Sequence, residues 1–147
     1  MNEKKIKRVF QQGPITGTYI GESIAAHARK KEIGAHSIFL GQVRDDAKLN
    51  SKVSAIEYTA YEDMANQQFH EIREAMFAKY NLTCLHIYHS LGVVRAGEIS
   101  LFVFTSSPHR HAAIEACAEI VERVKKEVPV WGREILENES YQWKENH

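Results

Sequence analysis

The sequence predicts an α+β fold in which helices pack on an antiparallel or mixed sheet. Its helical and extended segments follow the order helix, strand, strand, helix, strand, strand, helix. Because the strands come in neighbouring pairs that turns can join, this order favours hairpins over a parallel sheet. The 147 residues are the length of one domain with a substantial core. We therefore expect a single domain over residues 1–147, with its helices on one side of the sheet.

The first four elements follow from the spacing of apolar residues and from the turn signals between them. They are a helix over residues 20–32, strands over 35–43 and 53–61, and a helix over 62–80. Gly34 is placed to end the first helix, and the polar stretch 45–52 is typical of a loop. The helix over 62–80 has the clearest pattern, with one apolar face that holds Ala65, Phe69, Ile72, Met76 and Tyr80.

The second half predicts strands over 84–91 and 99–105 and a last helix over 108–127. The inward face of this helix is expected to hold Ile114, Cys117, Val121, Val124 and Val128. Pro129 ends the helix, because proline has no backbone N–H and restricts the residue before it. No strand is predicted after Pro129, and residues 136–147 are expected to form a loosely packed arm.

Charge and hydrophobicity exclude several classes of protein. The chain has 19 basic and 19 acidic side chains, so its bulk charge recruits neither nucleic acid nor a membrane surface. No apolar run approaches the roughly 18 residues of a membrane-spanning helix, and none follows the N-terminus as in a secretory signal. We therefore expect a cytoplasmic protein with no membrane or nucleic-acid partner.

Cysteine and histidine spacing gives no sign of a metal site. Cys84 falls in an apolar strand and Cys117 on the apolar face of a helix, so both are expected to be buried hydrophobic residues without a disulfide. His86 and His89 are three residues apart on a strand and so face opposite sides. Neither a glycine-rich phosphate loop nor a nucleophile-elbow motif occurs. We expect no metal and no cofactor.

The start of the last helix is a candidate anion-binding site. Ser107 is placed as the N-cap and Pro108 as the first helical residue, which puts His109 and Arg110 in the first turn. Unpaired backbone N–H groups and the positive end of the helix dipole coincide there, so a phosphate or carboxylate could bind. A capped helix with a surface arginine is the alternative interpretation.

Lys125 and Lys126, near the end of the same helix, are candidates for chemistry. They lie about 100° apart around the helix, so one can reach a pocket while the other stays in solvent. A lysine beside an apolar wall such as Trp131 could act as a base or a nucleophile. Alternatively, the pair only complements the negative end of the helix dipole. Arg44, between a strand and a loop, is a candidate binding residue or a solvated arginine.

The two ends of this helix are too far apart for one small substrate. His109 and Lys125 are separated by 16 residues, or about 24 Å at the usual helical rise. If both belong to an active site, that site must be shared between two subunits. Under this interpretation the sequence predicts a homodimer.

Several short segments are specific in combination and in their order. They are Phe39-Leu40-Gly41-Gln42-Val43-Arg44, Tyr61-Glu62-Asp63-Met64-Ala65, His89-Ser90-Leu91-Gly92, Ser106-Ser107-Pro108-His109-Arg110, and Lys125 followed by Val128-Pro129-Val130-Trp131 and Glu134. Together they resemble the MoaE family, the large subunits of molybdopterin synthase. The resemblance extends from about residue 8 to residue 144.

The resemblance implies an α/β hammerhead-type fold and a central homodimer. At each end the homodimer would bind a small ubiquitin-like sulfur-carrier subunit (MoaD-like), giving a heterotetramer. The carrier's C-terminal Gly-Gly, as a thiocarboxylate, would thread into the large subunit. The implied substrate is cyclic pyranopterin monophosphate, which would receive two sulfur atoms to form the dithiolene of molybdopterin. The implied activity is that of a sulfurtransferase without a cofactor of its own.

The resemblance also assigns roles to individual residues. Lys125, four residues before Pro129, matches the catalytic lysine of the family. Substrate binding is implied for Arg44, His109, Arg110, Lys126 and Arg133. The tunnel for the carrier tail would be lined by Phe39, Pro129 and Trp131. His109 and Arg110 would reach the pocket of the neighbouring subunit.

The chain departs from the family pattern around the tryptophan. Where the family usually has lysine directly after it, this chain has Gly132, followed by Arg133. Thr59 stands in place of a common glutamate, and Ser90 in place of a common arginine. Gly132 leaves open a non-catalytic anion-binding or carrier-docking module of the same fold. A dimeric phosphoester-binding protein unrelated to sulfur is a third possibility.

Overall fold

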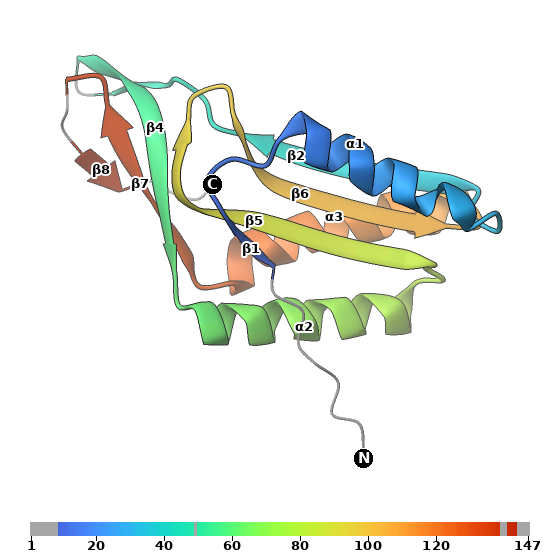
Figure 1. The fold of residues 1–147 in the computed structure, drawn as a ribbon. Coiled ribbons are helices and arrows are strands. Elements are labelled where there is room, and N and C mark those ends of the chain that lie inside the picture. The colour runs from blue at the N-terminus through green and yellow to red at the C-terminus, as the bar shows by residue number, and fades with distance from the viewer. Residues whose placement is uncertain (1–8, 49, 139–140, 144–147) are drawn as a thin grey trace.

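One long strand belongs to two parts of the sheet in the computed structural model, which describes residues 9–48, 50–138 and 141–143. This strand, β5 (Cys84–Arg95), pairs antiparallel with β6 (Ile99–Ser107) through residues 84–89 and with β4 (Ser51–Ala60) through residues 92–95. Gly92 is the first residue of the second part and has a φ of 81°, a left-handed conformation that favours glycine. The sheet turns there, and β4 runs across the direction of β5 and β6 (Figure 1).

The order of the strands is β2, β6, β5, β4, β7, β8. The edge strands are β2 (Ala35–Gln42) and β8 (Tyr141–Trp143), and β7 (Val130–Leu136) lies between β4 and β8. Two short strands lie off this path: β1 (Phe10–Gln12) is parallel to β5, and β3 (Ala47–Lys48) forms a hairpin with β4 inside the predicted 45–52 loop. The sheet is therefore mixed, and the predicted α+β class is confirmed.

Helices cover both faces of this sheet. α2 (Glu62–Lys79) and α3 (Arg110–Glu127) lie on one face, whereas α1 (Gly17–Ala26) and the short 3-10 helix η1 (His27–Arg29) lie on the other (Figure 1). The expectation that all helices lie on one side is wrong because β6 is apolar on both faces. Leu101 and Val103 join the core under α2 and α3, whereas Phe102 and Phe104 pack against α1.

The predicted apolar face of α2 is confirmed, and that of α3 is confirmed in part. Ala65, Phe69, Ile72 and Met76 of α2 are buried, with Tyr80 partly buried beside them. The buried residues of α3 are Ala113, Ala116, Cys117, Ile120 and Val124. Ile114 was expected inward but is 53% exposed, because two small alanines face the sheet and let the helix approach it closely. Among the described residues, no helix combines the length and apolar composition needed to cross a bilayer.

α3 begins later than predicted. His109 is its N-cap and Arg110 its first helical residue, so Ser107 does not occupy the expected N-cap position. Ser107 nevertheless satisfies a helical N–H, since its hydroxyl oxygen accepts a hydrogen bond from Ala113 N at 3.1 Å. The same hydroxyl donates to the carbonyl oxygen of His109. The buried Ser107 side chain therefore holds the first turn from outside the helix.

α1 begins and ends earlier than predicted. Thr16 is its N-cap, and the threonine hydroxyl accepts a hydrogen bond from Tyr19 N at 3.1 Å. Gly34 does not end this helix. A Cβ atom at Gly34 would lie 2.0 Å from the carbonyl oxygen of Pro108, and Gly34 N donates to the Ser107 carbonyl at 3.0 Å. Gly34 thus allows the start of β2 to lie directly against the start of α3.

Two strands lie after Pro129, where none was predicted. β7 pairs antiparallel with β4, and β8 with β7. The prediction failed because Gly132, Arg133 and Glu134 interrupt the apolar alternation. Glu134 is buried all the same, with its carboxylate 3.6 Å from Lys48 Nζ. Of the expected C-terminal arm, residues 141–143 form β8, and residues 139–140 and 144–147 lie outside the described part of the chain.

Candidate functional site

Lys125 lies in the last turn of α3, at the protein surface. The preceding residue, Val124, is buried against the core, whereas residues 125–127 are exposed. The helix ends with a hydrogen bond from Val128 N to Val124 O at 3.3 Å, since Pro129 has no N–H to continue the pattern. The apolar stripe of α3 therefore fixes Lys125 on the solvent side of the helix end.

The other charged side chains near the end of α3 form ion pairs with residues one helical turn away. Lys126 Nζ lies 3.9 Å from the carboxylate of Glu122. Arg123 donates two hydrogen bonds to Glu127, and these bonds hold the pKa of that carboxyl below its usual range. Such exposed pairs one turn apart contribute little to stability, on the order of 0.3–0.5 kcal/mol each. At this site they pair the carboxylate of Glu122 with Lys126 and that of Glu127 with Arg123.

An exposed apolar surface adjoins the end of α3. Its members are Tyr61, Met64 and Trp131, which are 66%, 57% and 48% exposed. Tyr61 N donates to the Pro129 carbonyl at 3.3 Å, and the rings of Tyr61 and Trp131 lie edge to face with their centroids 6.5 Å apart. Residues 60–64 line an open hollow beside them. We call these three residues the apolar patch; clustered exposed apolar side chains of this kind are typical of a surface that binds a partner.

Arg133, the basic residue closest after Trp131 in the sequence, already forms an ion pair. The guanidinium of Arg133 pairs with the carboxylate of Glu57, which lies directly opposite on β4. Residues 132 and 133 of a strand point to opposite faces, so Arg133 cannot place its charge where a lysine at 132 would. Next to Gly132, burial raises the pKa of Tyr58, whose hydroxyl donates to Ser100 Oγ at 3.2 Å. The surroundings of position 132 are thus apolar and densely packed.

Gly132 leaves little room for any side chain. A Cβ atom there would lie 2.9 Å from Ile56 Cγ2 and 3.4 Å from a ring carbon of Tyr58, and both neighbours are buried. The lysine common in the family at this position would require Ile56 to move. Gly132 is therefore matched to the packing of Ile56 and Tyr58 in this chain.

Replacing Gly132 with lysine should lower the free energy of unfolding by about 1–3 kcal/mol, because the new side chain overpacks the contact with Ile56. Urea denaturation monitored by circular dichroism measures this change. Gly21→Lys is the matched control, since Gly21 lies in α1 with nothing within 4 Å of its Cβ position. The control should be as stable as the wild type or more stable. An unchanged midpoint for Gly132→Lys would contradict the packing argument.

His109 and Arg110 lie at the opposite end of α3 from Lys125. The helix has 18 residues, or a length of about 27 Å. Both side chains are exposed at the helix N-terminus, where an anion would meet the unpaired N–H groups. One subunit does not bring them to Lys125, in agreement with the separation inferred from the sequence.

Arg44 and Phe39 come from the far edge of the sheet. Arg44 follows β2, is exposed and forms an ion pair with Asp46 at 3.1 Å. Phe39, on β2, packs against the core under α3. Strands β6, β5 and β4 lie between β2 and β7, which carries Trp131. Of the three residues expected to line a tunnel, Pro129 and Trp131 lie together at the end of α3, whereas Phe39 is not their neighbour in the sheet.

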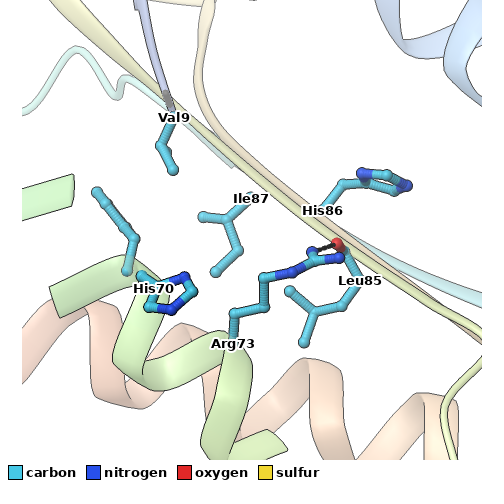
Figure 2. Close-up of a pocket in the computed structure, with 7 residues that line it drawn as sticks. Val9, His70, Arg73, Leu85, His86 and Ile87 are labelled. Carbon is cyan, nitrogen blue, oxygen red and sulfur yellow. Dashed lines mark hydrogen bonds between the residues drawn. The ribbon is translucent and has the colours of Figure 1, made fainter. Parts of the chain in front are cut away.

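A small cavity between α2 and β5 is not a substrate site. It has a volume of about 30 Å³ and is lined by Val9, Phe69, His70, Arg73, Leu85, His86 and Ile87 (Figure 2). The Arg73 guanidinium crosses it to donate a hydrogen bond to the Leu85 carbonyl. A space of this size holds on the order of one or two water molecules. It is too small for an organic substrate.

The cysteines do not supply an exposed nucleophile. Cys84 and Cys117 are both buried and free of disulfides, as predicted. Burial raises the pKa of the Cys117 thiol. The prediction of no metal site did not anticipate that Cys84 lies beside His27 and His86. The signal in the sequence is Cys84-Leu85-His86, which places two possible ligands on one face of a strand.

The apolar patch was also not predicted as a unit. Trp131 was expected at the site, but Tyr61 and Met64 appeared only as part of a family segment. Their joint position depends on the contact between the start of α2 and the end of α3, which the hydrogen bond from Tyr61 N to the Pro129 carbonyl makes. No local pattern in the sequence reveals a contact between residues so far apart.

Comparison with known proteins finds relatives that share one name. The molybdopterin synthase catalytic subunit of Bacillus subtilis (strain 168) is 38% identical over 130 residues, which are 88% of this chain and 82% of that protein. The protein of the same name from Pyrococcus abyssi is 39% identical over 116 residues, 79% of this chain and 78% of that protein. That of Drosophila grimshawi is 42% identical over 77% of this chain, and the chain spans only about a third of its length, 32%.

Solved structures agree with the sequence relatives. The X-ray crystal structure of molybdopterin synthase from Staphylococcus aureus matches with a TM-score of 0.82 at 29% identity, over 97% of this chain and 99% of that one. A chain of the complex of subunits 1 and 2 of molybdopterin-converting factor from Helicobacter pylori has the same fold, with a TM-score of 0.80 at 21% identity over 94% and 90% of the two chains. The family model described as MoaE protein matches residues 17–127. This chain therefore belongs to the MoaE family.

Proposed function

We propose that this chain is the catalytic large subunit of a molybdopterin synthase. In this proposal it transfers sulfur from the thiocarboxylated C-terminus of a small carrier subunit to cyclic pyranopterin monophosphate. The observation that carries the proposal is the exposed Lys125 at the end of α3, just before the turn that leads to Trp131 of the apolar patch. An amine beside a partner-binding surface is what a carrier tail with a reactive terminus requires.

The carrier would dock on the apolar patch and bring its C-terminus to Lys125. Support comes from the exposure of Tyr61, Met64 and Trp131 and from the open hollow along residues 60–64. The solved structure of the same fold from Helicobacter pylori is a complex of subunits 1 and 2 of molybdopterin-converting factor. Tryptophan and tyrosine are among the residues that supply most of the binding energy of an interface. The extended Gly-Gly tail can pass close to the protein because glycine has no side chain.

The sulfur transfer itself would use an amine and an anion site. The sulfur bonds to a carbon of the pterin substrate as a carbon–oxygen bond at that carbon breaks, and the oxygen leaves as water or stays on the phosphate. The carbon–sulfur bond of the thiocarboxylate breaks as its acyl group passes to water or, transiently, to the Lys125 amine. A second thiocarboxylated carrier supplies the second sulfur. The substrate phosphate would be held by His109 and Arg110 of the neighbouring subunit, with Arg44 and Lys126 as further cations. Neither buried cysteine takes part.

A site that takes Lys125 from one subunit and His109 and Arg110 from another requires a homodimer. His109 and Arg110 lie about 27 Å from the end of their own α3, so they can serve only a site formed with a second copy. A carrier at each end would then give a heterotetramer. We also propose that the protein acts in the cytoplasm, where thiols such as those of Cys84 and Cys117 stay reduced.

A non-catalytic carrier-docking module is a second candidate function. The observation that favours it is the packing at Gly132, which leaves little room for the lysine usual in the family, together with the engagement of Arg133 by Glu57. Such a module would keep the apolar patch and bind the carrier but form no product.

Reconstitution separates the two functions. The chain is mixed with a thiocarboxylated Gly-Gly carrier and cyclic pyranopterin monophosphate, and molybdopterin is measured after conversion to a fluorescent derivative. We expect product with the thiocarboxylated carrier and none with a carrier that ends in an ordinary carboxylate. Carrier binding without product, seen by co-elution in size-exclusion chromatography, would favour the docking module. No carrier binding at all would exclude both functions.

A further inference from the structure

A second group of reactive side chains lies on the α1 face of the sheet. Cys84 and His86 are alternate residues of β5 and therefore share this face. Figure 2 shows His86 on the opposite side of β5 from Leu85 and Ile87, which face α2. His27, the first residue of η1, meets them from across the layer. One ligand atom from each of His27, Cys84 and His86 lies within 4.8 Å of the others.

We propose that His27, Cys84 and His86 bind a Zn²⁺ ion. A thiolate with two imidazoles is a ligand set that zinc prefers, whereas Mg²⁺ and Ca²⁺ select oxygen. In a tetrahedral zinc site with usual bond lengths, two nitrogens lie about 3.4 Å apart and a nitrogen and a sulfur about 3.6 Å apart. His27 Nε2 and His86 Nε2 are already 3.0 Å apart. Small side-chain movements therefore suffice to bring all three atoms to coordination distance.

The surroundings of His27 favour its role as a ligand. Its Nδ1 lies 2.7 Å from the carbonyl oxygen of Ser23, so Nδ1 carries the proton and Nε2 presents its lone pair to the site. This arrangement, in which the second ring nitrogen donates to a backbone carbonyl, orients most histidine ligands of zinc. Ser23 is itself held one turn back, since its hydroxyl donates to the Tyr19 carbonyl at 2.9 Å. The helix thus positions the imidazole before any metal arrives.

Binding requires two proton movements and the displacement of one lysine. With His27 Nε2 accepting, the proton between the two rings belongs to His86 Nε2. The metal takes its place, and His86 stays neutral by taking up a proton at Nδ1. The thiol proton of Cys84 goes to solvent as the metal–sulfur bond forms. Lys30 Nζ, which donates to Cys84 Sγ at 3.0 Å, must turn away, and its exposed, flexible side chain is free to do so.

The proposed site has three protein ligands, which leaves the fourth position of a tetrahedral zinc ion to water, and it is independent of the proposed function. It lies on the face of the sheet opposite α3 and joins the end of α1 and η1 to β5, two parts of the chain that side-chain packing and the hydrogen bonds of His27 and Lys30 already connect. A ligand that binds only the folded state raises the unfolding temperature. Zinc should therefore stabilise this protein whether or not it makes molybdopterin.

Cobalt titration of the untagged, metal-free chain tests the site. Co²⁺ is the probe because a cobalt–thiolate bond gives a charge-transfer band in the near ultraviolet. We expect the band to saturate at one cobalt per chain and to disappear when Zn²⁺ is added. Cys84→Ser should abolish the band, and His27→Gln should weaken metal affinity by more than about 100-fold. Cys117→Ser and His111→Gln, at a cysteine and a histidine of α3, are the matched controls and should keep it.

The thermal unfolding temperature provides a second test of zinc binding. Zinc should raise the unfolding temperature of the wild type and of the control His111→Gln, but not that of His27→Gln. His27 is only half-buried, so this variant remains informative if Cys84→Ser does not fold. Absence of the charge-transfer band in the wild type, or its persistence in Cys84→Ser, would overturn the proposal.

Discussion

Lys125→Ala should bind the carrier as the wild type does but lose molybdopterin formation by at least about 10²–10⁴-fold, the range expected when a group that acts on the reacting atoms is removed. Lys125 is exposed beyond the buried stripe of α3, so its removal leaves the core and the apolar patch in place. Product is measured under single-turnover conditions with saturating thiocarboxylated carrier, and carrier affinity is measured separately by calorimetry.

Two further variants sharpen the result at Lys125. Lys125→Arg keeps a positive charge but cannot form an amide with the carrier, so activity in this variant would assign an electrostatic role to the lysine. No activity would favour the amine as a nucleophile or base. Lys79→Ala is the control, since Lys79 pairs with Glu119 on the surface formed by α2 and α3. Wild-type turnover in Lys125→Ala would remove this lysine from the mechanism.

Mixing two inactive variants should restore activity if the active site is shared between subunits. Arg110→Ala and Lys125→Ala each damage every site of their own homodimer. A mixed dimer has one site in which both residues are intact, because Lys125 then comes from one subunit and Arg110 from the other. Random exchange makes half of the dimers mixed, so the mixture should recover about a quarter of wild-type activity.

The same experiment distinguishes a site within one subunit. If Arg110 and Lys125 of a single chain acted together, every site of every dimer would lack one of them and no activity would return. The double variant Arg110→Ala/Lys125→Ala, mixed with wild type, is the control: its mixed dimers should have no intact site under the shared arrangement. A monomer in solution with full turnover would contradict the proposed homodimer directly.

The sequence predicts best those elements whose pattern is complete within a short segment. α2 has its apolar stripe within its own 18 residues, and its boundaries agree with the structure to within one residue. β7 was missed because its pattern includes Gly132, Arg133 and Glu134, and their suitability for a strand depends on β4. Glu57 and Lys48, which pair with Arg133 and Glu134, come from more than 70 residues earlier in the chain.

The candidate site also contains features that the sequence predicts and features that depend on contacts between distant segments. The separation of His109 from Lys125 follows from helical rise alone, and the structure agrees with it. The role of Lys125 comes from the family resemblance and not from spacing. The apolar patch depends on the contact between α2 and α3, and the group of His27, Cys84 and His86 depends on η1 lying over β5. Neither arrangement can be inferred from a single segment.

The candidate anion-binding end of α3 depends on Gly34, a residue that carries no functional group. The carbonyl oxygen of Pro108 occupies the space where any side chain at position 34 would begin, 2.0 Å from its Cβ. A methyl group there would displace the backbone just before His109 and Arg110, and with it the two side chains that serve the second subunit in the proposed homodimer. Position 34 should therefore tolerate substitution as poorly as a residue that contacts the phosphate, although glycine itself would never touch it.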